Sequence, residues 1–536
     1  MAGIVSSDTL DSWKAIAAYL RRDVRTVMRW EHARGLPVHR VPGGGKPGVY
    51  ALRPELDGWW KRTRAHLEEA AEPSEPQPRA PAVAVLPFAS LSADKDNEYF
   101  SDGLADEIIT LLTRIPRLRV TARTSSFAFR DRCQDVREIG ARLGVSALLE
   151  GSVQRSGGRV RVSAQLVETR TGFHLWSDSY DRDAADVFAV QDEIAHAIAH
   201  ALEVRLEPPP AVRPPMNLEA HGLWLKGRHY YYQLYEDVGA LAKSRSNLER
   251  AIALDPLFPR PYASLAELLR YASTIGLVPP REAIARGRAA LERALALDDS
   301  MGEAHALSGV YRAWADFDWN GAARDFGRAL ELAPASSHVH TLRVAYHLVP
   351  TGRLREAEEE MERAVESDPV SPLAYIELGK VLLWARHFDR AQAKLEAAFD
   401  LQPHYPPAVW YRGVGLYFQG RVAEALTVWQ QVMRTVGANP GMTGAIGMAL
   451  GYLGRHAEAR AALAELAAAE REGAVLRFSR AQIHLGLGET EAVFEWLDRA
   501  VDERDPAILD LPCKPIWDGV REDPRFTALL GKMRLV

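Results

Sequence analysis

The chain has 536 residues, 47% of them hydrophobic and 26% charged, so it is long enough for several domains and too apolar for wholesale disorder. Its two cysteines, Cys133 and Cys513, are far apart, which excludes a disulfide framework or zinc site and suits a reducing compartment. No signal-peptide pattern follows Met1, and no apolar run reaches the length of about 18 residues that a bilayer requires. We therefore expect no membrane span and a cytoplasmic location.

The net charge of −5 is unevenly distributed along the chain. Residues 1–66 hold twelve Lys and Arg against six Asp and Glu, a net charge of +6, which leaves −11 for the other 470 residues. A basic segment on an otherwise acidic chain is what contact with a phosphate backbone requires. The first residues are therefore a candidate nucleic-acid-binding module.

Two short helices are predicted in this basic segment. Trp13–Leu20 carries apolar residues at i, i+3, i+4 and i+7, behind Asp11 or Ser12 as candidate caps. A second helix is expected over Val24–Glu31, with an apolar face toward the first helix and a basic outer face. This is the helix-turn-helix arrangement that enters a DNA major groove.

A hairpin and a third helix are predicted next. Leu36–Val41 and Val49–Leu52 can pair around a glycine-rich turn, and a helix begins near Glu55. About the first 65 residues resemble the winged helix-turn-helix of the MerR/excisionase kind, most specifically in RTVMRWE-x3-GLPVHR. The resemblance implies that the DNA-contacting residues are Arg25, Thr26, Arg29, Arg40 and Lys46. The alternative is a small helical domain whose solvated basic face binds protein.

The pattern of an α/β domain begins at Val83 and continues to Leu206. Strand and helix signals follow the order β-α-β-α-β-β-β-α, which predicts a sheet with parallel and antiparallel parts. The segment resembles the amino-terminal domain of the TolB type in VAVLPF, YFSDGLADEIITLL, ARTSSFAF, IGARLGVSALLEGSV and WSDSYDR. Proteins of that kind combine this domain with a DNA-binding module and repeats, and some add a nucleotide cyclase or a membrane helix. This chain has no room for either between its parts, so the resemblance implies a cytoplasmic, non-catalytic member.

No catalytic, metal or cofactor site is expected in this α/β domain. Three carboxylates near the expected start of a helix favour the helix dipole: Asp102, Asp106 and Glu107. His196 and His200 lack the glutamate of a metalloprotease motif and are expected at the surface. Arg123 with Ser125 and Ser126 suits a small anion, and ordinary loop polarity explains these three residues equally well.

One phrase recurs five times in the second half of the chain. AIALDP, ALALDD, ALELAP, AVESDP and AFDLQP have leading alanines 43, 35, 35 and 34 residues apart. A period of about 34 residues in helix-forming sequence is typical of the tetratricopeptide repeat (TPR) family, which the segment resembles. We expect about eight helix pairs between Asn217 and Glu503, stacked into a superhelix with a concave face.

The family resemblance also indicates where a partner would bind. In tetratricopeptide proteins the first helix of each pair lines the concave groove, which holds another polypeptide. By that resemblance the groove residues are Leu342, Tyr346, Ile376, Lys380, Trp410 and Tyr417. The alternative is that the aromatic rings among them pack between neighbouring helices.

Together these patterns predict a multidomain chain: an N-terminal winged helix-turn-helix (1–69), a central TolB-N-like α/β domain (83–206) and a C-terminal all-α TPR solenoid (217–536) with a capping helix. Proline-rich linkers are expected at 70–82 and 207–216. The expected function is DNA-binding transcriptional regulation without enzymatic activity. Its expected partners are double-stranded DNA, a protein or peptide in the groove, and a second copy of the chain. The second hypothesis is an interaction scaffold whose helix-turn-helix no longer binds DNA.

Overall fold

The structure, a computed structural model, describes residues 8–20, 27–28, 31, 36–40, 49–59, 81–91, 98–115, 118–130, 135–156, 159–183, 187–202, 217–234, 239–436, 440–471 and 476–536. These residues belong to two compact units, Met1–Arg79 and Ala80–Val536. The expected linker at 207–216 lies outside the described residues, as does most of the linker at 70–82.

The first unit contains a small antiparallel sheet. Its strands are β1 (Thr9–Leu10), β3 (Val49–Leu52) and β2 (His39–Arg40), in that spatial order. The pairing of β2 with β3 confirms the predicted hairpin, although its turn lies outside the described residues. Strand β1 had no sequence signal, because two residues are too short to show an alternating pattern.

Helical residues complete this unit. Helix α1 (Trp13–Tyr19) begins behind Ser12, whose hydroxyl accepts a hydrogen bond from the backbone N–H of Ala15 at 3.2 Å, so Ser12 is the cap. Residues 27–28, 31 and 53–59 are also helical. The core includes the fully buried side chains Ile16, Val27 and Leu56. The predicted apolar faces are thus buried at Ile16 and Val27, whereas much of the second helix lies outside the described residues.

The second unit begins with a mixed sheet. Its strands are β4 (Ala82–Val85), β5 (Ala89–Ser90), β6 (Arg119–Val120), β7 (Ala147–Ser156), β8 (Arg159–Glu168) and β9 (His174–Asp183). The order is β6-β4-β7-β8-β9, with β5 also beside β7. The strands β6, β4 and β7 are parallel, whereas β7, β8 and β9 are antiparallel, which confirms the predicted mixed sheet.

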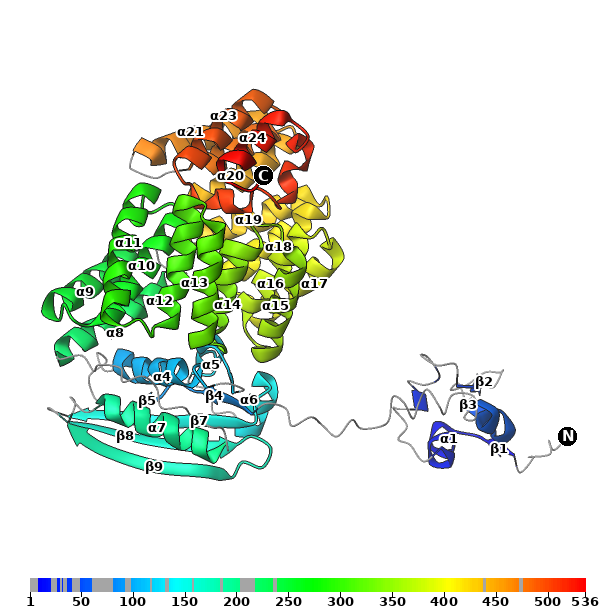
Figure 1. The fold of residues 1–536 in the computed structure, drawn as a ribbon. Coiled ribbons are helices and arrows are strands. Elements are labelled where there is room, and N and C mark those ends of the chain that lie inside the picture. The colour runs from blue at the N-terminus through cyan, green and yellow to red at the C-terminus, as the bar shows by residue number, and fades with distance from the viewer. Residues whose placement is uncertain are drawn as a thin grey trace. The chain divides into compact units, whose positions relative to one another are not determined.

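Helices cover both faces of this sheet (Figure 1). On one face lie α4 (Glu98–Leu112) and α7 (Val187–Ala201), and on the other lies α6 (Val136–Leu143). Strand β4 is buried on both sides, because its valines join the α4 cluster and its alanines join the α6 cluster. A short helix, α5 (Arg123–Phe127), follows β6.

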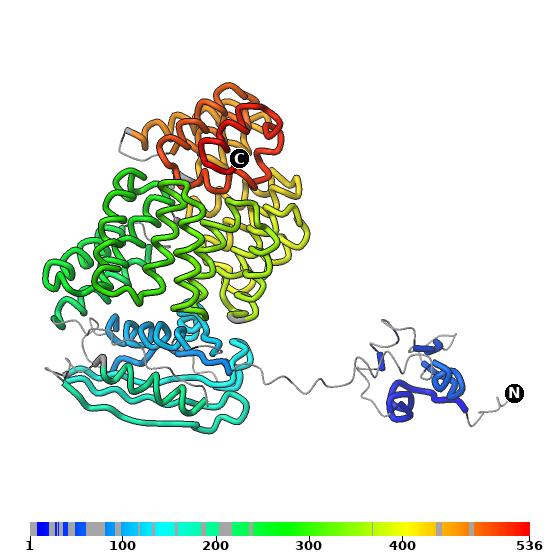
Figure 2. Tube along the Cα trace, viewed as in Figure 1, coloured from blue at the N-terminus to red at the C-terminus, as the bar shows by residue number. Residues whose placement is uncertain are grey.

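Among the described residues, consecutive helices then pack as eight pairs (Figure 2). Their bounds are α8 (Leu218–Gln233), α9 (Ala240–Leu254), α10 (Pro259–Thr274), α11 (Pro280–Leu297), α12 (Gly302–Tyr311), α13 (Trp319–Leu332), α14 (Ser337–Arg343), α15 (Leu354–Ser367), α16 (Pro372–Trp384), α17 (Phe388–Leu401), α18 (Pro406–Phe418), α19 (Val422–Val436), α20 (Pro440–Tyr452), α21 (His456–Arg471), α22 (Arg477–Gly486) and α23 (Thr490–Asp502). Two π-helical turns, η3 (Arg312–Asp316) and η4 (Val344–Leu348), extend α12 and α14. The chain closes with η5 (Pro506–Asp510), η6 (Pro515–Val520) and α24 (Pro524–Lys532).

Glycines in the first helices allow their partner helices to approach closely. A Cβ added at Gly379 would lie 2.5 Å from a methyl carbon of Leu395. A Cβ at Gly413 would lie 2.4 Å from the indole nitrogen of Trp429. A side chain at either position would collide with the large residue of the second helix, which confirms the close approach predicted at Gly379.

The segment after the last pair packs on a much earlier repeat. The indole N–H of Trp314 donates to the carbonyl oxygen of Arg504 at 2.7 Å, and the guanidinium of Arg504 donates to the carbonyl of Ala315 at 2.8 Å. The indole of Trp319 donates to the carbonyl of Met533 at 2.8 Å. The array therefore closes on itself across roughly 190 residues of sequence.

Buried ion pairs join the α/β sheet to the array through α4. The Glu107 carboxylate, 1% exposed, lies 2.6 Å from the guanidinium of Arg260 on α10 and 3.0 Å from the imidazole of His221 on α8. Burial opposes ionisation of Glu107, but Arg260 and His221 outweigh it and lower the pKa of the carboxyl. The preceding residue, Asp106, pairs with Arg228 on α8 at 2.8 Å.

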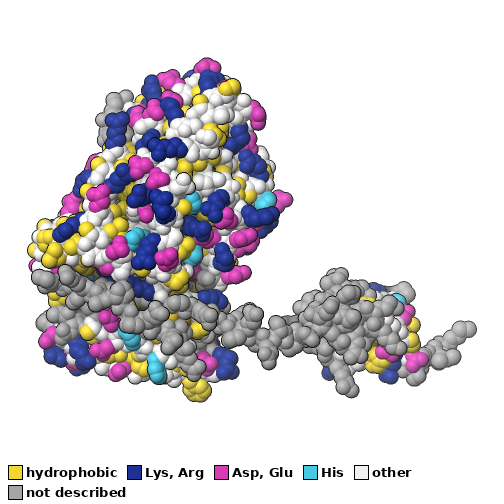
Figure 3. Space-filling model, in the orientation of Figure 1, with side chains coloured by type: hydrophobic (Ala, Val, Ile, Leu, Met, Phe, Trp, Pro, Cys, Tyr) yellow, Lys and Arg dark blue, Asp and Glu magenta, His cyan; other side chains and the backbone are white. Residues whose placement is uncertain are grey.

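The surface of this unit carries mixed charge. Figure 3 shows Lys and Arg interspersed with Asp and Glu over the visible face of the array. Within the part of the chain that the structure describes, none of the helices combines the length and the hydropathy needed to cross a bilayer.

Arg260→Met removes the permanent cation beside Glu107 and leaves a buried carboxylate poorly compensated. We expect the free energy of unfolding, measured by urea denaturation, to fall by about 3–5 kcal/mol. Arg328→Met is the matched control, because Arg328 pairs with Glu331 at 3.0 Å on the surface. Such exposed pairs contribute at most about 1 kcal/mol. Equal losses in the two variants would contradict the role assigned to Arg260.

Candidate functional site

A groove of about 1020 Å³ runs along the inner side of the array and ends against the α/β domain. Its walls come chiefly from the first helices α8, α10, α12, α14, α16 and α18, from α4 and α5, and from the segment Pro506–Lys514. A side pocket of about 180 Å³ shares Trp410, Tyr411 and Lys514 with the groove. Because these walls belong to one compact unit, the groove is a feature of the folded chain.

The residues that the sequence assigned to the groove gather here. Leu342, Tyr346, Ile376, Lys380 and Trp410 line the groove. Tyr417 lines the side pocket instead. The side chains of Leu342, Tyr346 and Ile376 are less than 10% exposed, so they contribute packing as well as surface.

The aromatic residues combine both of the roles that the sequence left open. The ring of Trp410 stacks on Trp429 with centroids 5.1 Å apart, and the ring of Tyr417 stacks on Trp429 at 5.9 Å. Trp429 is 1% exposed and its indole N–H donates to the carbonyl of Trp410 at 3.0 Å. Trp410 and Tyr417 therefore pack α18 against α19. The rest of their surface faces the two cavities.

A hydrogen-bonded ion pair on α10 lines the groove. Arg270 donates to Glu267 at 2.6 Å and to the hydroxyl of Tyr346 at 2.8 Å, and the hydroxyl of Tyr231 donates to Glu267 at 2.8 Å. Burial opposes ionisation, but Arg270, His338 and Tyr231 outweigh it and lower the pKa of Glu267 to about 2. The pair holds α8, α10 and η4 in register.

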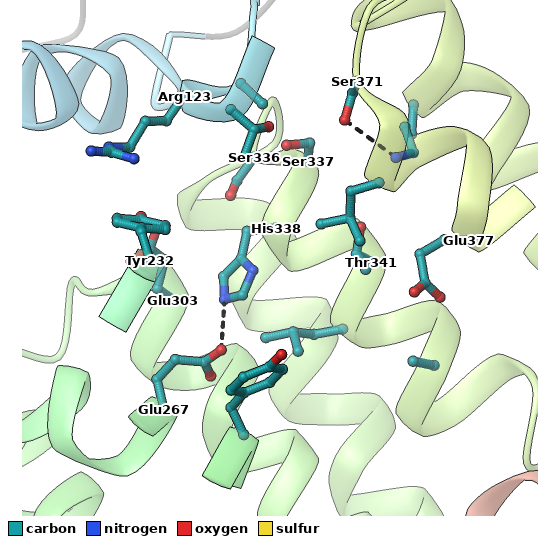
Figure 4. A pocket seen from close by; sticks show the side chains of 18 of the residues that line it. Arg123, Tyr232, Glu267, Glu303, Ser336, Ser337, His338, Thr341, Ser371 and Glu377 are labelled. Carbon is teal, nitrogen blue, oxygen red and sulfur yellow. Dashed lines mark hydrogen bonds and ion pairs between the residues drawn. The ribbon is translucent and has the colours of Figure 1, made fainter. Parts of the chain in front are cut away.

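At the α/β end, polar side chains from several elements converge (Figure 4). The Arg123 guanidinium lies 4.0 Å from the ring centroids of both Phe127 and Tyr232. Its nearest carboxylates, Asp102 and Asp106, are 3.8 and 3.9 Å away, outside hydrogen-bonding distance. Hydroxyl groups of Ser336, Ser337, Thr341 and Ser371 line the same end.

The sequence placed Asp102, Asp106 and Glu107 at a helix start, and that was wrong. Helix α4 begins at Glu98, so all three lie beyond its first turn, and all three are buried. They pair with arginines instead of with the helix dipole, Asp102 with Arg130 and the other two with the array. The error arose because nothing in the local sequence shows that a second domain covers α4.

The groove also contains charged residues that the sequence did not single out: Arg228, Glu267, Arg270, Glu303 and Lys514. Glu267 and Arg270 are three residues apart on a helix, a spacing that would have suggested an ion pair but not its place in the groove. Lys514 belongs to a segment with no repeat pattern, so no local signal could have found it.

Of the five residues assigned to DNA contact, Arg40 is the one that the structure describes. Its guanidinium lies 2.7 Å from the Glu31 carboxylate and 5.8 Å from the ring centroid of Trp13. The four others, Arg25, Thr26, Arg29 and Lys46, lie outside the described residues. About half of the Arg40 side chain is exposed.

The loop between α15 and α16 links the groove to the α/β domain. Val370 packs on the α6 cluster, and Arg119 donates to the carbonyl of Glu366 at 2.9 Å. Asp368, in the same loop, lines the groove and is 2% exposed. Burial raises the pKa of Asp368 to about 6.

Comparison with known proteins identifies the repeats. A tetratricopeptide repeat family model matches residues 376–441 and 445–508. A Rhizobium meliloti (strain 1021) protein named "Putative adenylate cyclase 3" is 39% identical over 209 residues, which are 38% of this chain. The chain spans 35% of the length of that relative. Tetratricopeptide repeats are thus present in the C-terminal region of the chain.

Two solved bacterial structures resemble parts of the fold. PilF of Pseudomonas aeruginosa matches 51% of this chain and 97% of its own, at 13% identity and a TM-score of 0.27. TolB from Acinetobacter baumannii matches 23% of this chain and 28% of its own, at 18% identity and a TM-score of 0.18.

Asp368→Asn tests the buried carboxyl of the α15–α16 loop. The folded pKa of about 6 lies above the unfolded value of about 3.9, so the stability from Asp368 is present below about pH 4 and lost as pH rises through 6. We expect the variant to match the wild type at pH 4 and to exceed it by up to about 3 kcal/mol at pH 7, in urea denaturation at each pH. Asp400→Asn, at an exposed position of α17, is the control. A difference that is constant with pH would refute the buried titration.

Proposed function

We propose that this chain is a DNA-binding transcriptional regulator whose groove binds an extended segment of a protein partner. The groove itself is the observation that carries the proposal. It runs past successive first helices, and its lining combines apolar rings with polar and charged side chains, as a site for a polypeptide requires. The tetratricopeptide repeats matched at residues 376–441, which form part of its wall, support protein binding independently.

The small first unit supports the DNA-binding half of the proposal. Its described residues include the capped helix α1, the β2–β3 hairpin and a shared apolar core. Its first 66 residues carry a net charge of +6. A single module of this size contacts a short site, so a homodimer would place two modules on two half-sites and raise affinity.

The competing proposal is an interaction scaffold whose first unit does not bind DNA. The contact of Arg40 with Glu31 favours it, because a neutralised arginine contributes less to phosphate binding. An enzymatic role is suggested by the name of the Rhizobium meliloti relative alone, and the alignment covers about a third of that protein. We favour the non-enzymatic regulator, because central charged groups of the groove are paired with one another, Glu267 with Arg270 and Glu377 with Lys380.

Thr341→Trp places a large ring in the groove from α14 without removing a buried contact, since Thr341 is only partly buried. We expect full-length Thr341→Trp to bind peptides selected by the wild type from a random display library at least about tenfold more weakly, by fluorescence anisotropy. Glu359→Trp, exposed on the outer helix α15, is the matched control. Both variants should have the same melting temperature as the wild type. Full peptide binding by a folded Thr341→Trp would place the site elsewhere.

The salt dependence of affinity for duplexes selected from a random pool tests the DNA-binding proposal. Arg25→Ala or Arg29→Ala should weaken specific binding by about 1–3 kcal/mol if the residue reads a base edge. Lys46→Ala should weaken binding to all sequences and reduce the slope of log affinity against log salt by about one. Arg328→Ala, in the repeat array, serves as the control. A wild type that selects no duplex would leave the scaffold proposal standing.

A further inference from the structure

Lys514 lines the groove from a segment outside the helix pairs. It lies between η5 and η6, after the last helix pair and beyond the residues that match the repeat family. It lines both the groove and the side pocket, so it lies where the two cavities meet.

The surroundings of Lys514 are mainly aromatic. Its Nζ lies 5.6 Å from the ring centroid of Trp384 and 5.1 Å from that of Phe478. It makes no ion pair and no side-chain hydrogen bond with any residue that the structure describes. The rings hold the amine in place but supply far less stabilisation than an opposite charge.

The charged side chains near Lys514 either bind other groups or form no ion pair with it. Lys380, which repels it, is paired with Glu377 at 2.8 Å. Asp505 accepts hydrogen bonds from the backbone N–H groups of Phe478 and Ala507 at 3.0 and 3.1 Å. Asp510 attracts Lys514 but forms no ion pair with it.

Burial disfavours the charged form of this amine. Desolvation, reinforced by Lys380, outweighs Asp510 and Asp505 and lowers the pKa of Lys514. A carboxylate brought to the junction would restore the charge and form an ion pair in a site of low dielectric constant. An arginine or lysine on the ligand could form no ion pair with this amine.

We propose that Lys514 binds the side-chain carboxylate of an Asp or Glu in the partner segment, and so gives the groove its preference for acidic sequences. This inference rests on the proposed peptide-binding function and goes further, because it names the chemistry that the groove recognises. The side pocket receives the acidic side chain, while the partner backbone continues along the groove.

The probes are peptides selected from the display library and resynthesised with acetylated and amidated ends, so that side chains supply every carboxylate. We expect the selected peptides to share an Asp or Glu. Changing it to Asn or Gln should weaken binding to the full-length wild type at least about tenfold. Lys514→Met should produce the same loss, and the two changes together should cost no more than either alone.

Two further variants make the experiment decisive. Lys514→Arg retains a cation and should restore most of the acidic preference, whereas Lys243→Met, at an exposed position on α9, should change nothing. If Lys514→Met does not fold, the peptide change in the wild type and Lys514→Arg still test the proposal. Selected peptides that lack acidic side chains, that need a free C-terminal carboxylate, or that bind Lys514→Met with unchanged acidic preference overturn it. A library from which the wild type selects nothing overturns the proposed groove function itself.

Discussion

The buried contact between Glu107 and Arg260 is the interaction on which the groove depends. The carboxylate comes from the helix that covers the sheet, and the guanidinium comes from the second helix pair. Each charge would be strongly unfavourable alone in this position, so the sheet and the array must keep one relative placement. That placement brings Arg123 and the first helices to the same cavity and makes the α/β domain the end wall of the groove.

Local patterns revealed much of the fold from sequence. Periodic alanines and prolines marked the helix pairs, Gly379 marked a close helix contact, and strand signals predicted the mixed sheet. Each of these features is decided within a few residues by backbone preference and apolar spacing. The residues expected to face the groove on α14, α16 and α18 came from the resemblance to tetratricopeptide proteins.

Contacts between distant segments could not be predicted from such local patterns. The carboxylates Asp106 and Glu107 of α4 looked like ordinary helix residues, since their arginine partners, Arg228 and Arg260, lie more than 100 residues away. The junction formed by Lys514 depends on how far the array curves, which is the sum of many small packing angles. The π-helical turns also lacked a sequence signal, although η4 carries Tyr346 into the groove.

The contact between Trp314 and the carbonyl of Arg504 changes how this array would fold. An open solenoid touches only its neighbours, so its repeats add one after another and its melting spreads over many partly folded states. Here an early repeat buries its indole against a segment that the ribosome makes about 190 residues later. The packing of the N-terminal repeats is therefore complete only after the C-terminal segment has been synthesised. We expect the finished array to unfold in a single cooperative transition, as a globular domain does.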